Sequence, residues 1–337
     1  MLIDLGGTDD RRRTQEMLVI DGSYGEGGGQ VVRTAVAIAA LTGTPIEIER
    51  IRAGRDRPGL AAQHCTAVRA VALACGAEMM GCSTGSGTLT FRPGEIGRTE
   101  IVLDIGTAGS IPLVLQAWLP VALVQGGRIT LTGGTEVQRS PTIDYIIHVL
   151  LPVLTGHGAA IDIEVRGRGY YPQGGGEVQV TAEASTIAPL DLSGLPDTRG
   201  ILSCSQNLPE HVAERQARAA AACLPGYEAT IERREGRSTG TSVTVWNRAK
   251  GACALGRRGL PAEQVGRMAA EELRAALNTP GETDIHLADQ LLVYLALSGG
   301  RYSAPAASSH ALTACHLLER FGLSVRIEKG TPAVFSA

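Results

Sequence analysis

Three stretches of the chain share one order of elements, and this internal repetition constrains the fold more than any single motif. Each has an apolar helical segment, a glycine turn, a short strand, a second helical segment and a final strand. Apolar residues recur every three or four positions in the helical parts, whereas "IEIERI", "RITLTGG" and "SVRIE" alternate at every second residue. The stretches span residues 31–94, 110–184 and 287–330. They predict a unit of two helices against one face of a small sheet.

A segment of different texture separates the second and third stretches. It begins with "STIAPLDLSGLPDTRG", rich in proline, glycine and serine, and closes with "NTPGETD". We therefore expect an α+β (α/β) protein with a large domain over residues 18–185 and 281–337 and a smaller α/β domain inserted at 186–280. Residues 1–17 carry charges of both signs but no apolar run, and they are interpreted as a flexible leader.

Composition excludes several classes of function. A net charge of −3 and 4% aromatic residues argue against a basic face for duplex DNA and against an extended base-stacking platform. The seven cysteines form no CxxC pair, so neither a disulfide framework nor a zinc site is indicated, and a reducing cytoplasm fits. No apolar run is long enough for a membrane span. The only lysines, Lys250 and Lys329, lie outside any KxDG sequence, which argues against a lysine-adenylate ligase.

The glycine-rich loop "GSYGEGGGQ" precedes an apolar helix, a combination typical of phosphate binding. Gln30 follows the last glycine, which excludes both a Walker A loop and the dinucleotide fingerprint. Glu26 would repel phosphate unless a divalent cation such as magnesium lay between them; the alternative is a solvent-facing turn residue. Arg33, three residues after Gln30, could face the same anion.

His310, in "SSHALT", is the candidate nucleophile. Ser308 or Ser309 is predicted to cap a helix, which places His310 in its first turn. The helix dipole there favours a neutral imidazole and attracts phosphate, so the ring could attack phosphorus. The alternative is a histidine that merely hydrogen-bonds its own backbone. Five of the other six histidines are interpreted as structural, with His316 in the core: His64, His148, His157, His211 and His316.

Two further stretches carry candidate binding groups. In "IRAGRDRPGL", Arg52, Arg55 and Arg57 cluster on a loop after a predicted strand, which suits a phosphate dianion, although such runs are more often solvated. In "HLADQ", residues 286–290, Asp289 and Gln290 open a predicted helix. They are interpreted either as capping residues or as contacts to a ribose or adenine.

Six motifs together resemble one known family. They are "DGSYGEGGGQVVRTA", "IRAGRDRPGLAAQH", "GTAGSIPLVLQ", "RGYYPQGGGEV", "HLADQ" and "SSHALT", in this order between residues 21 and 313. They are similar to the motifs of the RNA 3′-terminal phosphate cyclases. The resemblance implies three repeats of a βαβαββ unit, each with two helices on a four-stranded sheet, and a smaller α/β domain inserted before the third repeat.

The resemblance also implies a reaction that uses ATP and a divalent metal, Mg²⁺ or Mn²⁺. A histidine would take AMP from ATP, pass it to an RNA 3′-phosphate as RNA-(3′)pp(5′)A, and the 2′-hydroxyl would then close a 2′,3′-cyclic phosphate. The expected partners are ATP and RNA with a 3′-phosphate end, and an oligomer is compatible with the sequence. The cellular RNA, the activity on 5′-phosphate ends and the preferred metal stay open.

Residue by residue, the resemblance implies that His310 is the adenylated histidine and Glu26 the metal ligand. The implied phosphate and RNA-end ligands are Gln30, Arg33, Arg52, Arg55 and Gln63. The implied ATP contacts are Gln116, Pro141, His286, Leu287, Ala288, Asp289 and Gln290.

Two departures from the family pattern affect base stacking. The family often has tyrosine where His286 stands, and an aromatic residue where this chain has Ala252 and Cys253, so nucleotide selectivity can differ. Rival interpretations are a non-catalytic relative that acts in ribosome or RNA assembly, a phosphohistidine phosphotransferase, and an enolpyruvyl transferase built from similar repeats. The presence of His310 disfavours the first.

Overall fold

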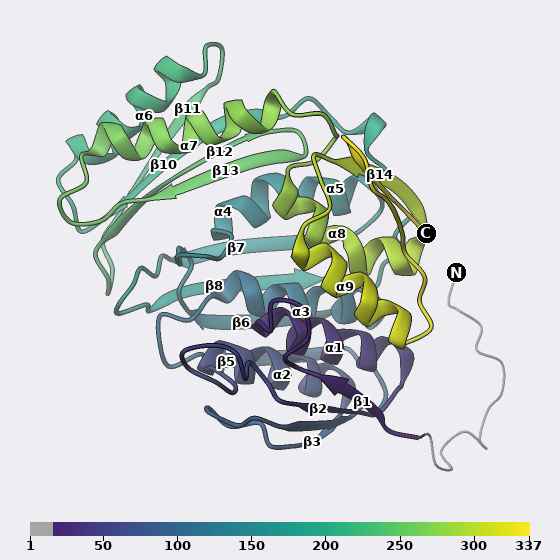
Figure 1. The fold of residues 1–337 in the computed structure, drawn as a ribbon. Helices are drawn as coiled ribbons and strands as arrows, with labels where there is room; N and C mark the ends of the chain where they lie inside the picture. Colours follow the sequence, from purple (N-terminus) through teal and green to yellow (C-terminus); the bar gives the residue numbers. More distant parts are fainter. Residues whose placement is uncertain (1–15) are drawn as a thin grey trace.

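The computed structural model of the chain describes residues 16–337, so most of the predicted leader lies outside the described residues. Figure 1 shows these residues arranged as four small sheets, each covered by helices. Three of the sheets share one strand order and belong to the three repeats, and the fourth belongs to the insert. The predicted α+β class and the predicted repetition are confirmed.

The first repeat has the order βαβαββ. Its first two strands are parallel, and the last two join the sheet antiparallel, in the order β1-β2-β4-β3. The elements are β1 (Leu18–Asp21), α1 (Gly29–Thr42), β2 (Ile46–Glu49), α2 (Ala62–Cys75), β3 (Glu78–Met80) and β4 (Leu89–Arg92).

The second repeat has the same order, β5-β6-β8-β7, but its second helix is irregular. A π-helical turn, η1, lies between α4 and α5, and Pro152 at the start of α5 has no N–H to continue the regular ladder. The elements are β5 (Thr99–Asp104), α3 (Ile111–Gln125), β6 (Gly127–Gly133), α4 (Ile143–Tyr145), η1 (Ile146–Leu150), α5 (Leu151–Gly156), β7 (Ile161–Gly167) and β8 (Gly176–Ala182).

The third repeat is interrupted by the insert. Its first strand, β9, precedes the insert and pairs in parallel with β14, which follows it. The insert therefore interrupts the third repeat after its first strand, and the predicted boundary at residue 186 lies a few residues early because β9 is only two residues long. The elements are β9 (Leu190–Asp191), α8 (Ile285–Ser298), β14 (Gly300–Ala304), α9 (Ser309–Arg320), β15 (Arg326–Glu328) and β16 (Ala333–Ser336).

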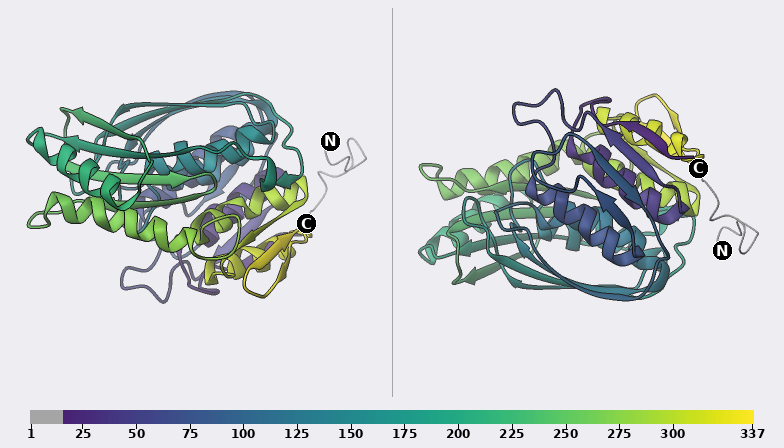
Figure 2. Two further views of the ribbon diagram at one scale, coloured as in Figure 1. Left: turned by 90° about the horizontal axis from the view of Figure 1, so that it is seen from above. Right: turned by 90° about the horizontal axis from the view of Figure 1, so that it is seen from below.

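The insert has a sheet and a core of its own. Two helices, α6 and α7, pack together on the sheet β11-β10-β12-β13, around Val243, Val245 and Leu273. In Figures 1 and 2 the insert extends away from the C-terminus. After the 3-10 turn η2 (Leu192–Gly194), its elements are β10 (Arg199–Gln206), α6 (His211–Cys223), β11 (Ala229–Arg234), β12 (Gly240–Asn247), β13 (Lys250–Leu255) and α7 (Ala262–Leu277).

The helices of the three repeats pack against one another and form a single hydrophobic core. Helix α1 contacts α2, α3 and α9, while α8 contacts α9 and α3, so the first and third repeats meet along α1 and α9. Among residues 16–337, no helix combines the length and apolar character that a membrane crossing requires.

A buried charge network joins the insert to the second repeat. The Arg168 guanidinium donates to Glu136 and Asp144 of the second repeat and to Glu232 of β11, and its side chain is 2% exposed. His148 stacks on Trp246 of β12, with ring centroids 3.9 Å apart. These contacts fix the insert beside the repeats.

Candidate active site

The glycine loop of residues 22–28 leaves the start of α1 open. Gly28 is the N-cap and no side chain caps the first turn, so its N–H groups are free to bind an anion. Gly25 has a φ of +62°, and a Cβ atom there would lie 2.1 Å from Thr313 Oγ1 of α9. Glycine therefore allows both the left-handed backbone and the close approach to α9.

His310 lies in the first turn of α9, as predicted. Ser308 is the N-cap, and its hydroxyl accepts from the Ala311 N–H at 2.8 Å. The His310 carbonyl accepts from Gln30 Nε2 at 3.2 Å, which ties the start of α9 to that of α1. Since the imidazole is 45% exposed, a ligand can reach it.

Glu26 faces His310 across this junction. Its Oε2 lies 3.1 Å from His310 Nε2, and its Oε1 accepts from the Ser309 hydroxyl. Arg55 approaches from the first repeat: one guanidinium nitrogen donates to the Glu26 carbonyl at 2.8 Å and lies 3.9 Å from the carboxylate. The carboxylate predicted to bind metal, the predicted nucleophile and a predicted phosphate ligand therefore lie side by side.

Two half-buried arginines add positive charge behind the glycine loop. Arg33 has no hydrogen bond or ion pair with any of residues 16–337, and burial lowers its pKa to about 10. Arg52 donates to the Gly59 carbonyl at 2.8 Å, and burial together with the charge of Arg55 lowers its pKa. Cations without acidic partners in such positions favour an anionic ligand.

Two histidines interpreted as structural contact the glycine loop. The His64 ring covers Gly29, where a Cβ would lie 1.9 Å from Nε2, and His64 Nδ1 accepts from the Ala61 N–H at 3.0 Å. Burial and the charges of Arg33 and Arg52 lower the pKa of His64 to about 3, so it is neutral. His316 is half-buried and stacks on Tyr24, with centroids 4.1 Å apart, instead of lying in the core.

The stretch 286–290 contributes one direct neighbour of the site. Asp289 accepts from the Ser308 hydroxyl at 2.6 Å, and burial raises its pKa to about 6, while that hydrogen bond and His310 act in the opposite direction. His286 is exposed, and Gln290 Oε1 is buried without a partner among residues 16–337. The side chains of Leu287 and Ala288 are buried in the core, so any ATP contact by them must use backbone atoms.

The other predicted residues lie around the start of α3. Gln63 Oε1 accepts from the Ser110 N–H at 2.9 Å, and Ser110 Oγ contacts Ser140 Oγ beside Pro141. Gln116 is half-buried one turn and a half further along α3. No contact among the described residues joins Gln116 or Pro141 to His310, so their ATP role stays a prediction.

The oxygen ligands at this site are few, which fits a divalent cation that is bound mainly by substrate phosphates. Among residues 16–337, no three His, Cys, Asp or Glu side chains are grouped for metal binding. Mg²⁺ is commonly held by one or two carboxylates, water and substrate phosphates, and Glu26 beside an open helix start meets that requirement. The buried, unpartnered Gln30 Oε1 adds an acceptor for a ligand donor.

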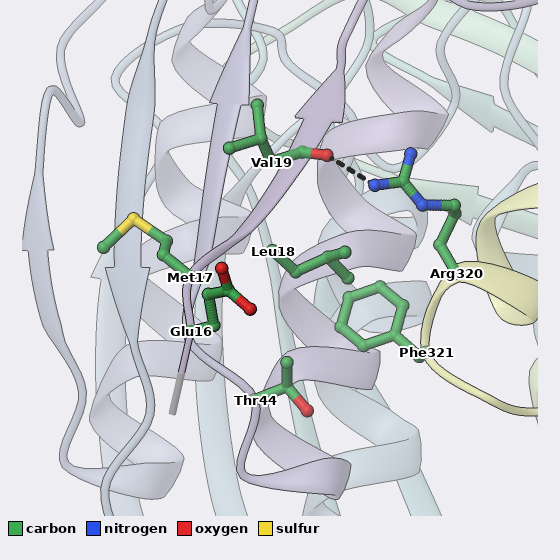
Figure 3. Close-up of a pocket in the computed structure, with 7 residues that line it drawn as sticks. All are labelled: Glu16, Met17, Leu18, Val19, Thr44, Arg320 and Phe321. Atoms are coloured by element: carbon green, nitrogen blue, oxygen red, sulfur yellow. Dashed lines mark hydrogen bonds between the residues drawn. The ribbon is translucent and has the colours of Figure 1, made fainter. Parts of the chain in front are cut away.

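The hollow in Figure 3 is remote from these residues. It is lined by β1, Thr44 after α1, and Arg320 and Phe321 at the end of α9, and Arg320 donates to the Val19 carbonyl at 2.9 Å. The first turns of α1 and α9 meet where Gln30 contacts His310, and both helices end beside this hollow. Helices α1 and α9 therefore run in the same direction. Their N-terminal partial positive charges add at the site.

Fold and site together define an α+β protein of three βαβαββ repeats, in which the first and third repeats bring His310, Glu26 and an open helix N-terminus together. A family model described as RNA 3′-terminal phosphate cyclase matches residues 24–328. The chain belongs to the RNA 3′-terminal phosphate cyclase family.

Relatives with this name match nearly the whole chain. The RNA 3′-terminal phosphate cyclase of Methanococcoides burtonii is 45% identical over 322 residues, which cover 93% of this chain and 97% of the relative. That of Pyrobaculum neutrophilum is 44% identical, covering 93% and 95%. That of Pyrococcus furiosus is 41% identical, covering 90% and 93%.

Proposed function

We propose that the protein converts an RNA 3′-terminal phosphate into a 2′,3′-cyclic phosphate with ATP, through AMP linked to His310. The observation that carries the proposal is the junction of α1 and α9. There an accessible imidazole lies 3.1 Å from Glu26, between two helix N-termini and close to Arg55. Family membership supports the same reaction.

In the first step, an imidazole nitrogen of His310 attacks the α-phosphorus of ATP. A P–N bond forms, and the bond from the α-phosphorus to the bridging oxygen breaks and releases pyrophosphate. The uncapped N–H groups at the start of α1, with Arg33, would offset negative charge on the phosphates. Glu26 and phosphate oxygens would hold Mg²⁺ or Mn²⁺, which when bound would neutralise phosphate charge.

In the second step, an oxygen of the RNA 3′-phosphate attacks the same phosphorus and His310 leaves, which yields RNA-(3′)pp(5′)A. The 2′-hydroxyl oxygen then attacks the RNA phosphorus, its proton passes to water, and AMP leaves. AMP is a far better leaving group than oxide, and the ribose already holds the 2′-oxygen beside its target. Arg52 and Arg55 would hold the terminal phosphate during both displacements.

The test is transfer of label from ATP. With α-labelled ATP and Mg²⁺, the protein should gain an acid-labile, alkali-stable label, and His310→Ala or His310→Asn should lose it. His211→Asn, at the start of α6 in the insert, is the matched control and should retain it. Labelling from γ-labelled ATP would establish a phosphotransferase instead. No labelling of the wild-type protein would favour a non-catalytic relative.

A further inference from the structure

Three adjacent loops form a row that leads away from the candidate site. Residues 105–110 lie against α2: the Ser110 N–H donates to Gln63 Oε1 at 2.9 Å, and a Cβ on Gly109 would lie 3.1 Å from Gln63 Cβ. Residues 169–175 follow, since a Cβ on Gly174 would lie 2.8 Å from Ala108 Cα. Residues 235–239 of the insert are the third loop of this row, and we call the three loops together the loop path.

The last contact in the loop path crosses from the second repeat to the insert. A Cβ on Gly175 would lie 2.8 Å from Arg237 Cδ, so the arginine side chain rests on the glycine backbone. The Tyr170 N–H also donates to Ser238 Oγ at 2.9 Å, which fixes the two loops together. The path is therefore continuous from Gln63, next to His64 and the glycine loop, to the insert.

The exposed side chains on and beside the loop path suit a single-stranded nucleic acid. Tyr171 is 76% exposed, more than any other large hydrophobic side chain among residues 16–337. Arg237 and Arg139 are exposed, and neither guanidinium has a hydrogen bond or ion pair within those residues. Arg139 precedes Ser140, whose hydroxyl contacts that of Ser110. An exposed aromatic ring stacks on a base, and free arginines pair with backbone phosphates.

We propose that the nucleotides preceding the RNA 3′-phosphate lie along the loop path, with one base stacked on Tyr171 and a backbone phosphate bound by Arg237. The assignment rests on the proposed function for the position of the RNA end. Tyr171 is the only exposed aromatic residue of the loop path, which limits stacking there to one base. A ring face accepts any base, so binding should depend on strand length and little on sequence. The insert then contributes to RNA binding through Arg237.

The test compares a long and a minimal ligand. A labelled single-stranded RNA of about ten nucleotides with a 3′-phosphate is titrated with the protein, and a nucleoside 3′-monophosphate is titrated in parallel. Stacking is worth about 1–3 kcal/mol per base, so Tyr171→Ala should weaken binding of the long RNA roughly 5- to 150-fold. Binding of the nucleoside 3′-monophosphate should be unchanged, and Tyr171→Phe should bind both ligands like the wild type.

The salt dependence of RNA binding distinguishes the contribution of Arg237 from that of Tyr171. Arg237→Ala should reduce the slope of log K against log salt by roughly 0.7, because a single strand releases about that many counterions per phosphate contact. Tyr171→Ala should leave the slope unchanged. Arg326→Ala, an exposed arginine on β15, and Met80→Ala, 74% exposed on β3, are matched controls that should leave both ligands unaffected.

Three results would overturn the proposal. They are wild-type affinity of Tyr171→Ala and Arg237→Ala for the long RNA, an equal loss for the nucleoside 3′-monophosphate, and a Tyr171→Phe variant as weak as Tyr171→Ala. Failure of the proposed reaction is a different result: the wild type would take no label from α-labelled ATP, while these binding measurements would still decide whether the loop path holds RNA.

Discussion

At the scale of single residues, two arginines of the first repeat have no carboxylate within the described part of the chain to balance their charge. Arg33 has no acidic partner among residues 16–337, and Arg52 donates only to a backbone carbonyl. Burial keeps His64, which packs against Gly29, neutral, and the charges of Arg33 and Arg52 lower its pKa in the same direction. Unpaired, half-buried guanidinium groups raise the free energy of the empty site, and binding of an anion would lower it.

Arg52→Ala should impair RNA cyclisation more than self-adenylylation. If Arg52 binds the terminal phosphate, loss of a charge-assisted contact worth about 1.5–3 kcal/mol should slow the RNA steps roughly 10- to 150-fold. Single-turnover assays of each step measure this, and Arg92→Ala, exposed on β4 of the same repeat, is the control. Equal losses in both steps would instead assign Arg52 to ATP.

His64 should make the protein sensitive to acid. Its folded pKa of about 3 lies below its ordinary value of 6.5, so below pH 6.5 the unfolded chain binds more protons than the folded chain. The free energy of unfolding should therefore fall as pH drops from 6.5 toward 3. His64→Gln, whose amide oxygen can still accept from the Ala61 N–H, should flatten this fall in denaturant titrations; an unchanged pH dependence would contradict the assignment.

At the scale of elements, the site depends on how closely α1 and α9 approach. Gly25 contacts Thr313, Gln30 contacts the His310 carbonyl, and Ser309 contacts Glu26, so three contacts fix one helix start against the other. Ser308 both caps α9 and donates to Asp289 of α8. The position of His310 is thereby set by three helices.

Gly25→Ala should separate these helices. The new methyl group collides with Thr313 Oγ1 and also strains a φ of +62°, so we expect a loss of roughly 1–3 kcal/mol in stability and a strong loss of self-adenylylation. Gly43→Ala has a similar φ of +70° but no atom within 4 Å, so it should lose only about 1–2 kcal/mol and keep activity. Adding Thr313→Ala to Gly25→Ala should restore part of the activity; no restoration would contradict the collision.

At the scale of the whole molecule, the insert and the repeats are joined by buried charge. Arg168 donates to Glu136 and Asp144 of the second repeat and to Glu232 of the insert, so three carboxyl groups share one positive charge. The pKa of Glu136 is raised to about 7, chiefly by burial; Arg168 lowers it and the nearby Asp144 raises it. The Arg168 guanidinium is thus the charged centre of a joint that also includes the stacking of His148 on Trp246.

Arg168→Met should weaken this joint. Removing one partner leaves buried carboxylates unpaired, which costs about 3–5 kcal/mol, and unfolding of the insert should separate from that of the repeats in calorimetry. Arg166→Met, two residues earlier but with exposed partners only, should change stability by less than about 1 kcal/mol. A single unfolding transition at the wild-type temperature would show that the network is not the joint.

The repeats, the helix cap at Ser308 and the arginine loop were predictable because each depends on local periodicity or on capping chemistry. The start of the insert was placed early because β9 has two residues and gains its strand character from β14, far along the chain. Strand β13 was not predicted, since "KGACAL" lacks clear alternation. The contact of His64 with Gly29 depends on packing between elements, which no local pattern encodes. Its position directly after Gln63 was the available signal.

Gln30 and His310 are separated by 280 positions yet meet at one junction. During synthesis on the ribosome, the glycine loop and the arginines emerge with the first repeat, long before α9 is translated. A chain that is halted before residue 310 lacks the proposed nucleophile, so it cannot capture AMP in the proposed manner. The proposed capture of AMP would therefore begin only once translation has completed the third repeat.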